Sequence, residues 1–276
     1  QLSLTYFFVL NNILLRSYSI TEVDMEYICE LKNISKRFHT INNETKAIDD
    51  ISFKVKKGEI VSIVGPSGSG KSTVLSLIAG LEEPSEGEVI VNTNSIGFMF
   101  QKDQLYEWRN VYKNCLLGLE VKNMDNDENK IKVKKMLEKY GLTNFKKHYP
   151  SQLSGGMRQR AALVRTLAIE PDLLLLDEPF SALDYQTRLA IGDEVGTILR
   201  NEKISTILVT HDIPEAVSIS DRVIVFTERP AKIKKEYEIK FDECHGERTP
   251  MKCRNTLTFG EYFRNIWRDL DVEKEE

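Results

Sequence analysis

The chain has 276 residues, of which 41% are apolar and 29% are charged, and its formal net charge is −4. This length is enough for one large or two small domains, and the proportions are ordinary for a globular protein. The slightly negative charge excludes an overall basic surface, so we expect no nucleic-acid partner, although a local basic patch stays open. No stretch approaches the roughly 20 apolar residues of a membrane span, so we expect any membrane role to depend on a partner.

The first 24 residues make a poor signal peptide. Their apolar stretch is interrupted by Asn11 and Asn12, and no basic residue precedes Arg16. Because Met25 lies just before the first clear strand, we expect it to be the natural start. Residues 1–24 would then be a disordered extension or an upstream reading artefact.

Alternating polar and apolar residues predict two half-buried strands at Ile28–Ile34 and Ile51–Val55. We expect these strands to pair in antiparallel fashion. Phe38 lies between them and has two interpretations. It is either a buried core side chain or a platform on which a base stacks.

The most informative stretch runs from Glu59 to Thr73, where an apolar run of strand length breaks into a glycine-rich loop. Residues 65–72 match the P-loop pattern G-x-x-x-x-G-K-[ST]. Glycines let backbone N–H groups approach phosphate oxygens, and the dipole of the following helix, at about 72–79, favours negative charge. Lys71 would neutralise phosphate, and Ser72 would offer a hydroxyl to Mg²⁺. The predicted cradle comprises Gly65, Pro66, Ser67, Gly68, Ser69, Gly70, Lys71, Ser72 and Thr73.

After two short predicted strands at Glu88–Val91 and Ser95–Phe100, the sequence becomes polar, lysine-rich and helical in pattern. Val133, Met136 and Leu137 share one helix face with Tyr140, and the lysines are interpreted as the solvated face. This pattern predicts a helical subdomain at about 102–170, inserted into an α/β body that spans 25–240.

Ser154-Gly155-Gly156 opens a helix in this region. In one interpretation Ser154 is an N-cap and the glycines are a flexible helix start. In the other, the segment offers a second set of backbone N–H groups to phosphate. Because the P-loop already holds one triphosphate, the second site would serve the nucleotide of another subunit, which predicts a head-to-tail dimer with two buried ATP molecules.

The continuous apolar run Leu173–Leu176 predicts a buried parallel strand, and Asp177 and Glu178 follow at its carboxyl end. Asp177 suits a metal site through a bound water, and Glu178 suits the orientation or deprotonation of an attacking water. The alternative is an ordinary solvated strand end. Further strands at Ile204–Val209 and Arg222–Phe226, separated by helical segments, predict a parallel α/β sheet.

Residues 241–276 form a tail of different composition. Thr258 and Glu261 fit a capping box. One apolar helix stripe consists of Phe259, Tyr262, Phe263, Ile266, Trp267 and Leu270. We expect it to pack on the body, with a partner-binding face as the alternative.

The four cysteines, Cys29, Cys115, Cys244 and Cys253, include no C-x-x-C pair. We expect reduced thiols in the cytoplasm and neither a zinc site nor a disulfide.

The complete set of motifs resembles the ABC ATPases over about residues 27–240. The matching segments are residues 65–73 (Walker A), Gln101 (Q-loop), 153–160 (signature), 173–178 (Walker B), 181–184 (D-loop) and His211 (switch histidine). The resemblance implies an α/β P-loop NTPase of the ABC type, with a mixed sheet core, an antiparallel β subdomain and an inserted helical subdomain. It implies ATP hydrolysis in a head-to-tail dimer.

The resemblance also implies roles for individual residues. Lys71 would bind the β- and γ-phosphates, and Ser72 and Gln101 would ligate Mg²⁺. Glu178 would be the general base, and His211, which is otherwise a structural histidine, would hold the γ-phosphate and the water. Ser154, Gly155 and Gly156 would close over the partner's nucleotide, Asp184 would link the two sites, and Phe38 would stack on adenine.

Residues 106–111 resemble importer subunits, in which this segment meets a coupling helix of the permease, whereas local packing of Trp108 is the alternative. Residues 226–233 and 258–272 are similar to ATPase subunits of nitrate, sulfonate and taurine importers, a group that includes pyrimidine-precursor transporters. We therefore expect a motor subunit at the cytoplasmic face of the membrane, partnered by permease subunits and indirectly by an extracytoplasmic binding protein. The alternative is a soluble ABC ATPase that acts in cofactor assembly or on nucleic acid.

Overall fold

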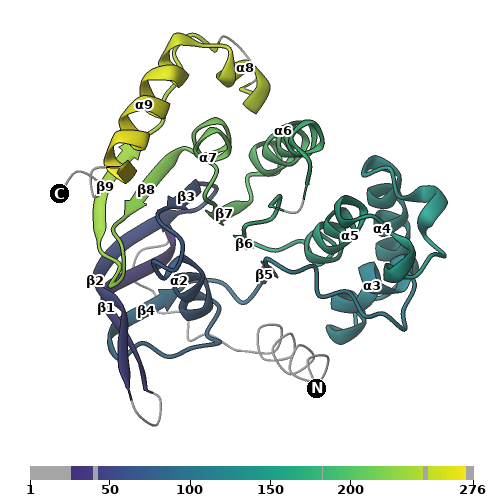
Figure 1. The fold of residues 1–276 in the computed structure, drawn as a ribbon. Coiled ribbons are helices and arrows are strands. Elements are labelled where there is room, and N and C mark those ends of the chain that lie inside the picture. Colours follow the sequence, from purple (N-terminus) through teal and green to yellow (C-terminus); the bar gives the residue numbers. More distant parts are fainter. Residues whose placement is uncertain (1–25, 40–42, 182, 245–247, 272–276) are drawn as a thin grey trace. The chain divides into compact units, whose positions relative to one another are not determined.

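The computed structural model describes residues 26–39, 43–181, 183–244 and 248–271 (Figure 1). The predicted extension at 1–24 lies outside these residues. The described chain divides into two compact units, one of residues 93–188 and one that combines residues up to 92 with those from 189 onward. Each unit is described by itself below.

The unit that contains both ends of the described chain has an antiparallel sheet in the order β2-β1-β4. Its strands are β1 (Tyr27–His39), β2 (Glu44–Lys56) and β4 (Glu86–Val91). Leu31, Ile34 and Ile51 are buried, and Leu31 pairs with Phe53 across β1 and β2. The predicted antiparallel pair is confirmed, and both strands are longer than the alternation indicated.

The same unit contains a mixed sheet in which β3 (Ile60–Val64) lies between β7 (Ser205–Val209) and β8 (Arg222–Phe226), parallel to both. β9 (Ile233–Glu238), which the sequence patterns missed, pairs with β8 in antiparallel fashion. β3 and β7 are buried along their whole lengths, as a sheet covered on both faces requires. The helices next to these strands in the chain are α2 (Lys71–Ile78), α6 (Tyr185–Asn201) and α7 (Ile213–Ile219).

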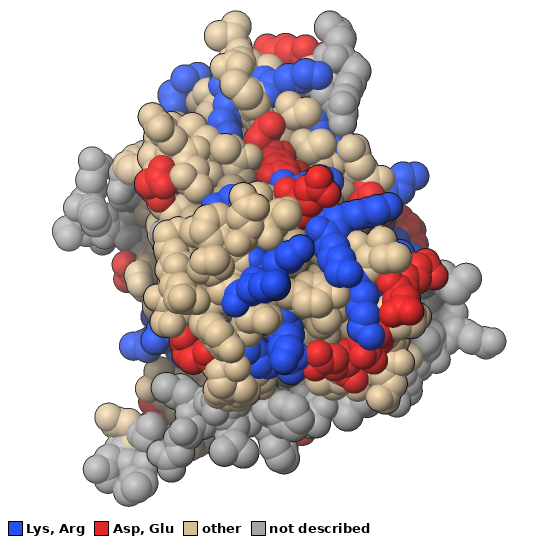
Figure 2. Space-filling view, turned by 90° about the vertical axis from the view of Figure 1, so that its right-hand side faces the viewer, with Lys and Arg blue, Asp and Glu red and all other residues tan. Residues whose placement is uncertain are grey.

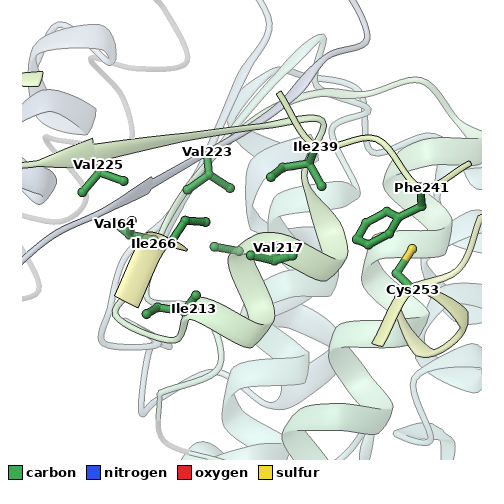
Figure 3. Close-up of a cluster of buried hydrophobic side chains, with 10 residues drawn as sticks. Val64, Ile213, Val217, Val223, Val225, Ile239, Phe241, Cys253 and Ile266 are labelled. Atoms are coloured by element: carbon green, nitrogen blue, oxygen red, sulfur yellow. The ribbon is translucent and has the colours of Figure 1, made fainter. Parts of the chain in front are cut away.

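The tail contributes α8 (Pro250–Arg254) and α9 (Leu257–Asp271). Ile266 is fully buried against α7 and β8 residues (Figure 3). Phe259 and Tyr262 are partly buried against the same cluster. The stripe therefore packs on the body, although Trp267 stays 53% exposed. The predicted capping box is wrong. α9 begins one residue before Thr258, and Thr256 Oγ1 accepts the hydrogen bond from the Phe259 amide instead.

The unit of residues 93–188 pairs β5 (Ile96–Met99) with β6 (Leu173–Asp177) in parallel. Its helices are α3 (Val111–Val121), α4 (Asp127–Lys139), η1 (Thr143–Phe145), η2 (Pro150–Gln152) and α5 (Gly155–Leu167). α3 lies close to α5, since a Cβ on Gly118 would come within 2.6 Å of Ile169 just beyond α5.

The α4 face predicted to be apolar is confirmed. Val133, Leu137 and Tyr140 are buried and Met136 is partly buried, whereas Lys134 and Lys135 are exposed. Figure 2 shows a face of the molecule on which Lys and Arg side chains gather with Asp and Glu side chains beside them. Among the described residues, no helix has the length and apolar character that crossing a membrane requires.

Gly87 in β4 gives a test of the antiparallel sheet. Its φ is +86°, and a Cβ there would lie 2.3 Å from the carbonyl oxygens of Lys32 and Asn33. We expect Gly87→Ala to lower the free energy of unfolding by about 3 kcal/mol, because the left-handed strain adds to a clash with backbone.

The matched control is Gly58→Ala. Gly58 has φ +75°, but the nearest atom to its Cβ would be 3.5 Å away, so about 1 kcal/mol is expected. Urea unfolding of both variants measures the difference. Equal losses would contradict the clash.

Candidate functional site

The P-loop connects β3 to α2, and its conformation is set by glycines. Gly68 and Gly70 have φ of +75° and +102°, which other residues rarely adopt. Lys71 begins α2 and is only 6% exposed. Its Nζ donates to the carbonyl oxygens of Gly65 at 2.9 Å and Pro66 at 2.7 Å. The ammonium group is therefore held under the loop rather than in solvent.

Neighbouring atoms closely approach two glycines of this loop. A Cβ on Gly65 would lie 3.0 Å from Phe226 Cβ, and one on Gly70 would lie 3.0 Å from the Ala47 carbonyl oxygen. Ser69 Oγ is buried and has no hydrogen-bond partner among the described residues. The loop thus places a buried cation and an unsatisfied hydroxyl beside the exposed residues Ser67 and Gly68. This arrangement fits a phosphate group.

His211 and Phe38 belong to the same unit as the P-loop. His211 is exposed and follows β7, directly before the residue that caps α7. Asp212 Oδ1 accepts from the Glu215 amide at 2.9 Å, which fixes the chain on the carboxyl side of His211. Phe38, near the end of β1, is 37% exposed, with Lys36 Nζ 4.9 Å from its ring centroid. The buried-core interpretation of Phe38 is therefore wrong.

The other unit brings three predicted residues to the ends of its two parallel strands. Asp177 is the last residue of β6 and is 7% exposed. Glu178 follows with φ +46°, a left-handed conformation that non-glycine residues seldom adopt. Gln101, just beyond β5, donates from Nε2 to Glu178 Oε2 at 3.1 Å. The sequence did not predict this contact, because the two residues lie 77 positions apart.

The signature segment and the D-loop lie side by side in this unit. Ser154 caps α5 by accepting from the Met157 amide at 3.4 Å, as its N-cap interpretation requires, while Ser154 and Gly155 are exposed. A Cβ on Gly156 would come within 2.8 Å of Leu183 Cδ2. Asp184 Oδ1 accepts from the Thr187 amide at 3.0 Å, and hydrogen bonds from Thr187 lower the pKa of the Asp184 carboxyl. The neighbouring Ala182 lies outside the described residues.

A set of ion pairs that sequence reasoning missed connects α5 to the segment after Gln101. Arg158 pairs with Asp103 at 2.9 Å and with Glu107 at 3.0 Å. Arg165 donates to the carbonyl oxygens of Asp103 and Gln104 at 2.9 and 2.8 Å. Burial alone would raise the pKa of Asp103, but the hydrogen bonds from Arg158 and the Leu105 amide outweigh it, so this pKa is lowered.

Trp108 lies on this segment and is 63% exposed. Its ring stacks on the buried Tyr106 with centroids 4.6 Å apart. Local packing accounts for one face of the indole, whereas the rest of the ring stays in solvent.

Comparison with known proteins identifies the family. The model of the ABC transporter family matches residues 48–181. YtlC of Bacillus subtilis, an uncharacterized ABC transporter ATP-binding protein, is 41% identical over 252 residues, which cover 88% of this chain and 96% of YtlC. The taurine import ATP-binding protein TauB of Roseobacter denitrificans is 36% identical over 257 residues, which cover 89% of this chain and 95% of TauB. The chain belongs to the ATP-binding proteins of ABC transporters, which are ATPases coupled to transport.

A solved structure confirms the predicted fold class. The ATP-binding cassette MJ0796, a dimer bound to ADP and Pi, is similar with a TM-score of 0.70 and 33% identity. The similarity covers 77% of this chain and 99% of MJ0796.

The ion pair between α5 and Asp103 yields a test by pH. We expect Arg158→Met to raise the Asp103 pKa, as observed by NMR, and to lower the free energy of unfolding at pH 7 by about 2 kcal/mol, because a charged hydrogen-bond pair is lost. A carboxyl whose folded-state pKa is lowered contributes stability above its unfolded pKa, and this contribution disappears as pH falls through the folded pKa. The variant should therefore lose less stability on acidification.

The control is Lys135→Met, which removes a positive charge from the exposed side of α4. It should leave both the Asp103 pKa and the acid-side slope unchanged. An unchanged Asp103 pKa in Arg158→Met would contradict the assignment.

Proposed function

We propose that the chain is the ATP-hydrolysing motor subunit of a binding-protein-dependent importer. The observation that carries the proposal is the P-loop, in which Lys71 is held by the Gly65 and Pro66 carbonyls beneath an exposed run of backbone. Such a loop binds the phosphates of a nucleotide through N–H groups, helix dipole and ammonium charge. The importer assignment is supported by the similarity to TauB, whose name describes taurine import.

In this proposal the nucleotide is bound by residues of the sequence motifs. Lys71 contacts the β- and γ-phosphates, while the backbone of residues 65–73 surrounds them. Phe38 offers its exposed ring to adenine. Ser72, Gln101 and, through a water, Asp177 would hold Mg²⁺, and hydroxyl, amide and carboxylate oxygens are the ligands that this ion prefers. Bound Mg²⁺ would neutralise charge on the phosphate oxygens.

Hydrolysis is assigned to Glu178 and His211. Glu178 accepts the proton of the attacking water, and the hydrogen bond from Gln101 orients its carboxylate. His211 positions the γ-phosphate and the water. His211 is exposed between β7 and Asp212, the N-cap of α7, so a ligand can reach its ring.

The second phosphate-binding segment supports a dimer of two such chains. Ser154 and Gly155 are exposed at the N-terminus of α5, where backbone N–H groups favour an anion. We assign Ser154, Gly155 and Gly156 to the nucleotide of the second copy in a head-to-tail pair, with Asp184 linking the two sites. The dimeric state of MJ0796 with ADP and Pi supports this arrangement.

The proposed partners are permease subunits at the cytoplasmic face of the membrane and, through them, an extracytoplasmic binding protein. The transported compound would be a small anion such as nitrate, a sulfonate or taurine, since TauB is named for taurine. A pyrimidine-type vitamin precursor is the alternative substrate. Absence of any co-purifying integral-membrane partner would contradict the proposed partnership.

The role of Glu178 is tested by Glu178→Gln. The amide cannot accept the proton, so we expect ATP turnover to fall by at least about 10²-fold while ATP binding persists. The variant should accumulate as an ATP-bound dimer in light scattering.

The control for this experiment is Glu202→Gln, which changes an exposed glutamate just after α6. Its ATP turnover and its exchange between monomer and dimer should be the same as those of the unchanged chain. Turnover in Glu178→Gln at the original rate would reject Glu178 as the base.

The proposed permease contact is tested by Trp108→Ala. Because the exposed indole ring would be buried in the partner, we expect a loss of about 2 kcal/mol in binding, seen as weaker co-purification from detergent-solubilised membranes. The ATPase rate of the isolated chain should not change. Trp267→Ala, which removes the other exposed tryptophan of the described chain, is the control, and equal effects of both changes would contradict the assignment.

A further inference from the structure

Two cysteines that the sequence pattern kept apart meet in the tail. Cys244 lies in a turn after β9, where its amide donates to the Phe241 carbonyl at 3.1 Å. Cys253 lies in α8 and is fully buried in the cluster that contains Phe241, Ile239 and Val217 (Figure 3). The two sulfur atoms are 3.9 Å apart, and both thiols are free.

We propose that Cys244 and Cys253 form a thiol–disulfide exchange site, which reacts with low-molecular-weight disulfides and closes to a reversible internal disulfide. The sulfur atoms must approach from 3.9 Å to about 2.05 Å, a shift within reach of side-chain rotation. Cys244 is partly buried and is the more accessible of the two thiols, so it is the one that a reagent can meet, while the fully buried Cys253 can meet only Cys244. Cys244 would therefore be the thiol that reacts first with the reagent, and Cys253 the thiol that resolves the mixed disulfide.

The reaction balances in two exchange steps. Cys244 attacks a disulfide RSSR, which forms Cys244–S–SR and releases RSH with the cysteine proton. Cys253 then attacks the Cys244 sulfur, which forms the internal disulfide and releases a second RSH. Two protein thiols are oxidised and one RSSR is reduced to two RSH, so glutathione disulfide suffices as the oxidant.

Arg248 supports the second step. Burial raises the pKa of the Cys253 thiol, and the guanidinium of Arg248 opposes this rise through a hydrogen bond and its charge. Arg248 is held in place because it donates to Asp221 Oδ1 at 3.2 Å and to the Ile239 carbonyl at 3.4 Å. A fixed positive charge beside Cys253 stabilises the attacking thiolate.

The remaining two cysteines serve as internal controls. Cys29 and Cys115 are both fully buried, in β1 and α3. Burial raises the pKa of Cys115 to about 12, and it raises that of Cys29 as well. Neither thiol is expected to react in the folded protein.

The disulfide would close a short loop within the tail, at a place where the tail already packs on the body. Pro250 at the start of α8 packs on Gly196 of α6, and the Met251 amide donates to Asp193 Oδ1 at 2.6 Å. Cys253 shares its cluster with Ile213 of α7. A covalent link between positions 244 and 253 therefore restricts the unfolded chain while the native contacts persist, which stabilises the folded state.

The experiment treats the full chain with glutathione disulfide, blocks free thiols with N-ethylmaleimide and maps the peptides by mass spectrometry. We expect a peptide pair linked through Cys244 and Cys253, reversed by dithiothreitol, and a rise of about 5 °C in Tm. Cys29 and Cys115 should be recovered as thiols after denaturation. No nucleotide is needed, so the result is independent of the proposed ATPase role.

Two variants separate the steps. Cys253→Ser should stop at a stable glutathione adduct on Cys244, whereas Cys244→Ser should form no adduct. Cys115→Ser should still form the internal disulfide, and circular dichroism checks that each variant is folded. If Cys244 in the unchanged chain stays a stable glutathione adduct, stays unreacted, or links only to a second chain, the proposal is overturned.

Discussion

The conformation of the P-loop depends on close contacts at two of its glycines. Gly65 approaches Phe226 at the end of β8, and Gly70 approaches the Ala47 carbonyl of β2, so a Cβ at either position would force a neighbouring atom or the loop to shift. Ala47 is itself fixed, because its carbonyl accepts from the Ala231 amide at 2.9 Å. The loop is therefore positioned by both sheets of its unit. Ser67 and Gly68 are left exposed, and the Lys71 ammonium group is held by the carbonyl oxygens of Gly65 and Pro66.

A second constraint acts in the unit of residues 93–188. Arg158 and Arg165 both project from α5, and both bind the segment that follows Gln101. The helix that begins at the exposed Ser154 is thus tied to the chain that carries Trp108. A displacement of the Trp108 segment would pull on α5 through charged hydrogen bonds, which break at greater cost than neutral ones.

Features that depend on residues close together in the sequence could be predicted, whereas contacts between distant residues could not. The P-loop, the buried run of β6 and the Ser154 cap are local patterns, and the residues alone indicated them. The Gln101–Glu178 contact and the Arg158–Asp103 pair join residues 77 and 55 positions apart, so no local pattern specifies them. The capping box failed for a different reason. Thr256 and Thr258 both precede the same apolar stripe, and only the packed helix decides which hydroxyl lies at its start.

The tail shows how a segment of different composition becomes part of the core. Its stripe has the 3.6-residue period of a helix, and Ile266 fills a fully buried position beside Ile213 and Val217 of α7. α7 begins after Asp212, whose cap fixes the backbone that carries His211. The packing of α9 and α8 therefore supports the helix that anchors His211. The same cluster buries Cys253 next to Cys244, so one set of apolar contacts surrounds both this thiol pair and the helix that follows His211.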